Sequence, residues 1–158
     1  MVTSTDTEEP APLSAGEARD AIFSQHEVLR GLANEVVDRA AGAAAAGGAL
    51  DDLRVHAQRL YTALGEHMTF EEEALTAALR DVIGWGAVLQ AEMRADHAHQ
   101  RATLASAVSA LHAGGRSGVD LAEGVRAFAT MLLIDMEREE RALLHADLDA
   151  IAQDVEGG

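Results

Sequence analysis

The stretch His67-Met68-Thr69-Phe70-Glu71 places an imidazole and a carboxylate four residues apart. On an α-helix this spacing sets the two side chains about 40° apart around the axis and ~6 Å apart along it. They therefore lie on one helix face and can approach the same metal ion. Exposed His and Glu at this spacing are common on ordinary helices, so a metal site requires further ligands at the same level from the rest of the chain.

The composition favours a single, almost wholly helical domain. The chain has 158 residues, of which 48% are hydrophobic, enough for one domain with a buried core. Its two prolines are Pro10 and Pro12, so no later residue breaks a helix in the way proline does. Aromatic residues make up 3%, which is low for β-structure, whereas the strong helix formers alanine and leucine are abundant. We expect a disordered tail over residues 1–13 and one domain over residues 14–155.

Charge and residue types exclude several classes of function. The formal net charge is −15, and every basic residue is arginine. A chain this acidic lacks the basic patch that phosphate contacts need, so we expect it to bind neither nucleic acid nor an anionic membrane. The absence of cysteine excludes disulfides, thiolate metal sites and thiol catalysis. No apolar run resembles a signal peptide or a membrane span, so we expect a cytoplasmic protein.

Start and stop signals divide the chain into four long helices. Ser14 and Glu17 form a capping box that starts the first helix, and glycine pairs end the first and third helices near residues 45 and 113. Asp51 or Asp52 can cap the second helix, and Asp120 can cap the fourth. Helices of about 30 residues with short links predict an all-α, up-down-up-down four-helix bundle.

Each of these helices carries an apolar stripe that is interrupted by metal-binding side chains. The apolar positions are Ile22, Leu29, Ala33, Val36 and Ala40 in the first helix, Leu53, Leu60, Leu64, Ala74, Leu75 and Ala78 in the second, Val88, Leu104, Val108 and Leu111 in the third, and Leu121, Val125, Phe128, Leu132 and Leu143 in the fourth. The interrupting side chains are His26, His67, Glu71, His97, Asp135 and Glu139. Glu72 and Glu73, which follow Glu71, are expected to be solvated.

All six interrupting side chains fall in one layer of the predicted bundle. With ~1.5 Å of rise per residue and alternating helix directions, they lie roughly 12–22 Å above the start of the first helix. Three other histidines, His56, His112 and His145, fall at other levels, and His99 points ~160° away from His97. Because buried carboxylates without a cation are costly, the layer predicts a metal site.

The ligand types indicate which metals this layer would bind. Imidazoles mixed with carboxylates, and no sulfur, suit iron or manganese, and zinc is an alternative. Glu71 and Glu139 can each bridge a pair of ions, as in other helical bundles that hold two iron ions. We therefore expect two metal ions.

The order of these motifs resembles that of the hemerythrin-like (HHE cation-binding) proteins. The matching segments are His26 in HEVLR, His67 and Glu71 in HMTFEEE, His97 in DHAHQR, and Asp135 to Glu140 in DMEREE. The resemblance covers the chain from about Ser14 to Leu144, and its specificity rests on the order and layering of short motifs. It implies a non-haem centre of two iron ions, joined by an oxo or hydroxo bridge, that meets O2, peroxide or nitric oxide.

Two positions depart from the oxygen-carrying members of that family. Those proteins have a second histidine four residues after the position of His97, where this chain has Arg101, and a histidine where it has Asp135. Fewer imidazoles and more carboxylates stabilise oxidised metal, which favours redox turnover or sensing over reversible carriage of O2. Arg101 could pair with Asp135, polarise a bound peroxide, or extend from the bundle as a partly exposed side chain.

The resemblance also implies how the ligands divide between the two ions. Carried over residue by residue, one ion receives His26 and His67, the other receives His97 and Asp135, and Glu71 and Glu139 bridge them. Glu140 could replace Glu139.

Three functions follow from these expectations. The first is a protein that senses or detoxifies O2, peroxide or nitric oxide, with peroxidase-like or catalase-like activity as one form. The second is an oxygenase with two iron ions acting on an organic substrate, for which Gly65, Ala74 and Ala78 would leave space beside the metals. The third is a non-catalytic bundle that binds metal or a protein partner.

Overall fold

The computed structural model describes residues 11, 13–46, 50–78, 85–113 and 115–145. Residues 1–10 and 12 of the expected tail, and residues 146–155 of the expected domain, lie outside this described part. No helix in the described ranges is long and apolar enough to cross a membrane.

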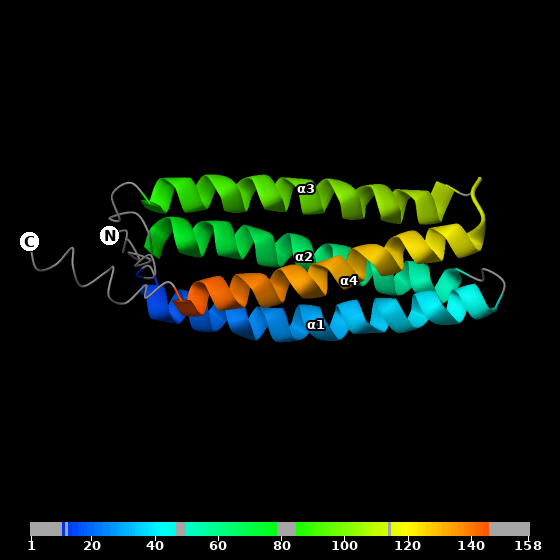
Figure 1. Cartoon of the computed structure of the whole chain (residues 1–158), viewed down its shortest axis with the longest axis horizontal. Helices are drawn as coiled ribbons and strands as arrows, with labels where there is room; N and C mark the ends of the chain where they lie inside the picture. Colours follow the sequence, from blue (N-terminus) through cyan, green and yellow to red (C-terminus); the bar gives the residue numbers. More distant parts are fainter. Residues whose placement is uncertain (1–10, 12, 47–49, 79–84, 114, 146–158) are drawn as a thin grey trace, which may run out of the picture.

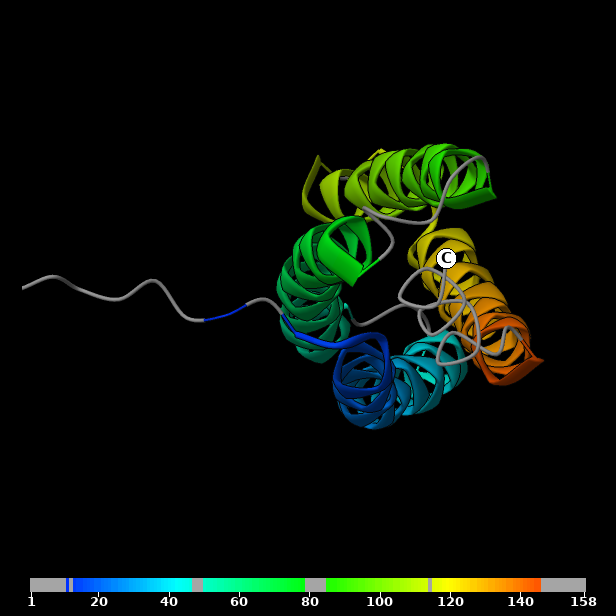
Figure 2. The same cartoon turned by 90° about the vertical axis from the view of Figure 1, so that its left-hand side faces the viewer.

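Four long helices lie side by side along the molecule (Figure 1). They are α1 (Ala15–Ala45), α2 (Asp51–Ala78), α3 (Trp85–Ala113) and α4 (Gly118–His145). α1 and α3 begin at the end of the molecule where α2 and α4 finish, so successive helices are antiparallel (Figure 1). Viewed along the axis, the helices surround a common interior, with α1 and α3 each packed against α2 and α4 (Figure 2). The predicted all-α, up-down-up-down bundle is confirmed.

The helix starts agree with the sequence at α1 and differ at α2 and α4. The capping box is present, because Oγ of Ser14 accepts from the backbone N–H of Glu17 and Oε2 of Glu17 accepts from that of Ser14. α2 and α4 begin slightly earlier than predicted, so Asp51, Asp52 and Asp120 lie in the first turns and do not cap them. At these positions their carboxylates still interact favourably with the positive, N-terminal end of the helix dipole.

The predicted apolar stripes form the core, except that Val88 is exposed and Leu143 is only partly buried. The stripe residues of α1, and those of α2 as far as Leu75, are buried, as are Leu104, Val108 and Leu111 of α3. Val88 is 50% exposed, because the nine residues that separate it from His97 make about two and a half turns and place it on the opposite face. The prediction for Val88 was therefore wrong, and the side chain of Ala78 lies outside the described part.

Two apolar clusters fill the bundle at different levels. The larger extends from Leu29 towards the α1–α2 and α3–α4 turns, and the smaller contains Ala15, Ile22 and Leu75 near the start of α1. Between Ile22 and Leu29, the core holds buried polar side chains instead. The two clusters thus enclose a single polar layer, about a third of the way along the helices.

Candidate metal centre

Five of the six predicted ligand side chains meet in this polar layer, and all four helices contribute to it. They form two overlapping groups, one of His26, His67 and Glu139 and the other of Glu71, His97 and Glu139. Within each group, one nitrogen or oxygen atom from each residue lies within 4.8 Å of the others. The carboxylate of Glu139 belongs to both groups, so it could contact two neighbouring ions.

The imidazoles present their Nε2 atoms to the centre of the layer. Nε2 of His26 lies 3.2 Å from Nε2 of His67 and 3.4 Å from Oε2 of Glu139. Oε2 of Glu71 lies 3.1 Å from Nε2 of His97 and 3.5 Å from Nε2 of His67. His26 and Glu71 are fully buried, and His67 and His97 are nearly so. Glu139 is partly exposed, so the layer is a largely buried cluster of potential ligand atoms that is accessible at Glu139.

On the outer side of the layer, each imidazole donates a hydrogen bond from Nδ1 to an oxygen atom. The bonds run from His26 to Glu140 at 3.0 Å, from His67 to Gln25 at 2.8 Å, and from His97 to Glu72 at 2.9 Å. An oxygen partner places the proton on Nδ1, so the neutral ring keeps a lone pair on Nε2. Metal-binding histidines are commonly held in this tautomer by an outer carboxylate or carbonyl.

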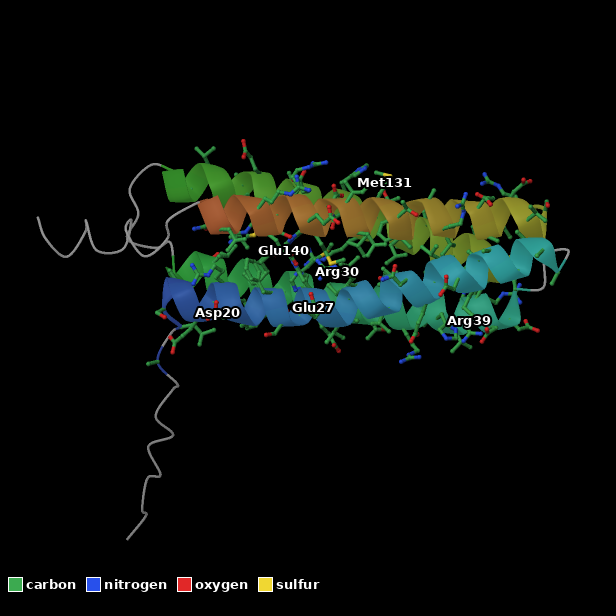
Figure 3. The ribbon with its side chains drawn as sticks, turned by 60° about the horizontal axis from the view of Figure 1, so that its bottom comes forward. Asp20, Glu27, Arg30, Arg39, Met131 and Glu140 are labelled. Carbon is green, nitrogen blue, oxygen red and sulfur yellow. The ribbon has the colours of Figure 1, made fainter. Side chains whose placement is uncertain are left out.

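Two of these outer carboxylates are themselves held by arginines. Arg30 donates to Glu140 at 2.9 Å across the seam between α1 and α4 (Figure 3), and Arg101 donates to Glu72 at 3.1 Å between α3 and α2. Each arginine lies four residues after the histidine of its own helix. The structure pairs Arg101 with Glu72, so the suggested pair of Arg101 with Asp135 was wrong.

The same arrangement of histidine, arginine and glutamate residues therefore occurs on two opposite sides of the ligand layer. α1 and α3 each carry a histidine with an arginine four residues later, while α2 and α4 each carry adjacent glutamates, three in α2 (residues 71–73) and two in α4 (residues 139–140), of which the first two take part in each case. In each glutamate pair the first lies in the layer and the second binds an Nδ1 atom. The carboxylate of the layer on α4 is thus that of Glu139, and Glu140 holds His26 from outside.

The repeat is broken at one position, which Asp135 occupies. Asp135 precedes Glu139 by four residues, just as His67 precedes Glu71. Its carboxylate belongs to neither ligand group, since Oδ2 accepts from Gln100 at 3.3 Å and Oδ1 lies 3.4 Å from Arg138. The structure thus brings His67 into the layer and leaves its counterpart Asp135 beside it.

The electrostatics of the layer favour a positive charge at its centre. Although burial acts in the other direction, neighbouring carboxylates raise the pKa of His26 and of His97, so both rings attract a proton. Burial, together with the charge of the nearby imidazoles, lowers the pKa of His67 to about 4. Burial raises the pKa of Glu71, while contacts with His26 and Glu71 overcome burial and lower that of Glu139. Protons and metal ions compete for such sites.

Glu71 gives the most direct indication that the layer fits a metal ion. Within the described part of the chain, neither of its buried oxygens accepts a hydrogen bond. Nε2 of His97 is only 3.1 Å away, and in the neutral ring, with its hydrogen on Nδ1 facing Glu72, this nitrogen has no hydrogen to donate; only a proton added to Nε2 or a metal ion between the two atoms would satisfy the carboxylate. A buried carboxylate in this situation is unfavourable unless a cation compensates it. Three imidazole nitrogens and two carboxylates, that of Glu71 included, suit iron, manganese or zinc.

The outer residues were the part of the centre that sequence reasoning missed. Glu72 was expected to be solvated, yet it lies between His97 and Arg101, whereas Glu73 is exposed as expected. Gln25 and Arg30 were not singled out. The repeated His-x-x-x-Arg spacing and the repeated Glu-Glu pair were the available signals for Glu72 and Arg30, while Gln25 has no counterpart in the repeat.

The comparison with protein families agrees with this geometry. The model described as the hemerythrin HHE cation binding domain matches residues 17–146. This span contains the ligand layer and the outer partners of all three histidines. No curated protein and no solved structure gives a significant match to the chain.

Proposed function

The chain belongs to the hemerythrin HHE cation-binding domain family, and on this basis we propose that it binds two iron ions and reacts with O2, peroxide or nitric oxide. The observation that supports this proposal most strongly is the convergence of three Nε2 lone pairs on two carboxylates, one of them without a hydrogen bond in the described residues. Sensing or detoxification fits the chain better than O2 carriage, because Arg101 and Asp135 stand where the oxygen-carrying members have histidines.

The two ligand groups would divide the side chains between two ions. His26 and His67 would hold one ion, His97 would hold the other, and Glu71 and Glu139 would lie between them. Asp135 is the remaining ligand that the sequence predicts, and it lies next to the position of the second ion. Bound iron would supply the redox chemistry with O2, peroxide or nitric oxide.

The surrounding residues orient and enclose this centre. Glu72 and Glu140 keep the Nδ1 protons in place and aim the rings of His97 and His26 inwards. The apolar clusters above and below the layer limit access of water, which strengthens the electrostatic interactions within it.

Iron content and an absorption spectrum would test the proposal. Protein from iron-supplemented cells should contain about two iron ions per chain and show near-ultraviolet bands of bridged iron that change when peroxide is added. His67→Ala should lose iron and the bands, whereas His56→Ala, on the same helix but bonded to the backbone of Asp52, should keep both. Wild-type protein without stoichiometric metal would favour the non-catalytic bundle instead.

An oxygenase is the second candidate, and a cavity beside the ligands favours it. A cavity of about 410 Å³ between α3 and α4 reaches His67, His97 and Glu139. It is not where the sequence suggested, since Ala74 is buried in the core and Gly65 lines a different groove beside Tyr61 and Arg101. Metal-dependent incorporation of oxygen from labelled O2 into an added organic compound would distinguish this candidate.

A further inference from the structure

The cavity between α3 and α4 connects the ligand layer with the molecular surface. Its inner end is lined by His67, His97 and Glu139, and its walls include the buried side chains of Met68, Leu132 and Met136. Exposed residues of α3 and α4 form its outer rim. A molecule bound there would contact both the surface and the proposed metal ions.

The size of the cavity exceeds what a diatomic molecule needs. Its volume of about 410 Å³ is more than ten times the ~30 Å³ that a water molecule occupies in the liquid. Sites for small organic molecules typically measure roughly 300–1,000 Å³ and have mostly apolar walls. The methionine and leucine side chains on its walls suit an apolar body.

The charged side chains at the rim determine which kind of polar group a bound molecule would carry. Glu92, Asp96 and Asp135 contribute three carboxylates, against the single guanidinium of Arg138 among the lining residues. Arg138 already lies 3.4 Å from Asp135 and so compensates that carboxylate. The remaining negative charge favours a cationic group and disfavours an anionic one.

Asp135, where the repeated arrangement of ligand residues is interrupted, lines this same cavity. Asp135 stands where the repeat has His67, and Gln100 and Arg138 hold it beside the layer. A second ion held by Glu71, His97 and Glu139 would receive a single imidazole, and His97 and Asp135 both line the cavity.

We propose that the α3–α4 cavity binds a small organic cation, an alkylammonium, with its apolar chain against Met68, Leu132 and Met136 and its ammonium group at Asp96 and Glu92. This proposal rests on the proposed function for the metal ions at its inner end. The bound molecule would lie on the His97 side of the centre.

Calorimetry on the full chain loaded with zinc, which is redox-inert, would test this site. The probes are n-butylammonium, n-butanol and butyrate, which share one apolar chain. We expect n-butylammonium to bind about tenfold more tightly than n-butanol, and butyrate to bind more weakly than either.

Two pairs of variants make the test specific. Asp96→Asn should weaken n-butylammonium binding about threefold and leave n-butanol unchanged, whereas Glu123→Gln, an exposed residue of α4 paired with Arg126, should change neither. Ala142→Trp at the exposed rim should reduce binding of both probes, whereas Ala127→Trp, exposed on the same helix outside the cavity, should not.

Each outcome decides the proposal. Equal binding of n-butylammonium and n-butanol, or no binding of any probe, would overturn it. Zinc content, measured in every sample, separates this result from the proposed function. If the chain takes up no metal, the metal proposal fails, while the same titration on the metal-free protein still decides whether the cavity binds the ammonium.

Discussion

The side-chain nitrogens of three histidines determine what the centre can bind. Each Nδ1 is committed to an outer oxygen, so each Nε2 turns its lone pair towards Glu71 and Glu139. Two such lone pairs, on His26 and His67, face each other at 3.2 Å. Only protons or metal ions make this arrangement favourable. Substitution of a single residue in the layer, or of a residue that accepts from an Nδ1 atom, should therefore change metal affinity.

The outer carboxylate of Glu72 should contribute to metal affinity without touching the metal. Glu72→Ala removes the acceptor that orients His97, and we expect zinc affinity at the His97 position to fall about 10–100-fold. Competition with a chromophoric chelator would measure the change. Glu73→Ala, at the exposed neighbouring position, is the matched control. Equal affinities for both variants would show that His97 needs no outer acceptor.

Glu71 should destabilise the metal-free protein in a pH-dependent way. Burial raises its pKa to about 7 from an ordinary value of 4.5, so folding favours its protonated form. Its contribution to stability is present below pH 4.5 and is lost as the pH rises through about 7. In the presence of chelator, Glu71→Gln should therefore become more stable than wild type as the pH rises from about 5 to 7. Urea unfolding at several pH values would measure this difference, and a difference that does not change with pH would contradict it.

At the scale of helices, the sequence predicted most of what the structure shows. Apolar periodicity gave the correct inner faces of α1, α2 and α4, and the capping box of α1 was readable from Ser14 and Glu17. Val88 was misplaced even though its spacing of nine positions from His97, about two and a half turns, already puts it on the opposite face. Starts of α2 and α4 were uncertain because an aspartate stabilises the first turn from several positions.

The N-terminal cap of α1 should stabilise the whole bundle. Ser14→Ala removes the side-chain oxygen that accepts from Glu17, and we expect the free energy of unfolding to fall by about 1 kcal/mol. Ser24→Ala, at an exposed position within the same helix, is the control. Denaturant unfolding of both variants would test this, and equal losses of stability would argue against a specific role of the cap.

At the scale of the molecule, antiparallel helices bring residues that are far apart in the sequence to one level. Rise per residue alone placed His26, His67, His97 and Glu139 in one layer, because long, uninterrupted helices make height a linear function of sequence position. The orientation of the side chains was harder to predict from the sequence. Asp135 has the right height and face, but its contacts with Gln100 and Arg138 depend on packing between α3 and α4, as does the cavity beside it.

The central claim is that one polar layer of the bundle holds two metal ions between Glu71 and Glu139. X-ray diffraction from crystals of the iron-loaded protein, recorded on both sides of the iron absorption edge, would test it most directly. We expect two anomalous difference peaks, one next to Nε2 of His26 and His67 and the other next to Nε2 of His97. Iron-loaded crystals without peaks in this layer, or with peaks only on the acidic surface, would contradict it.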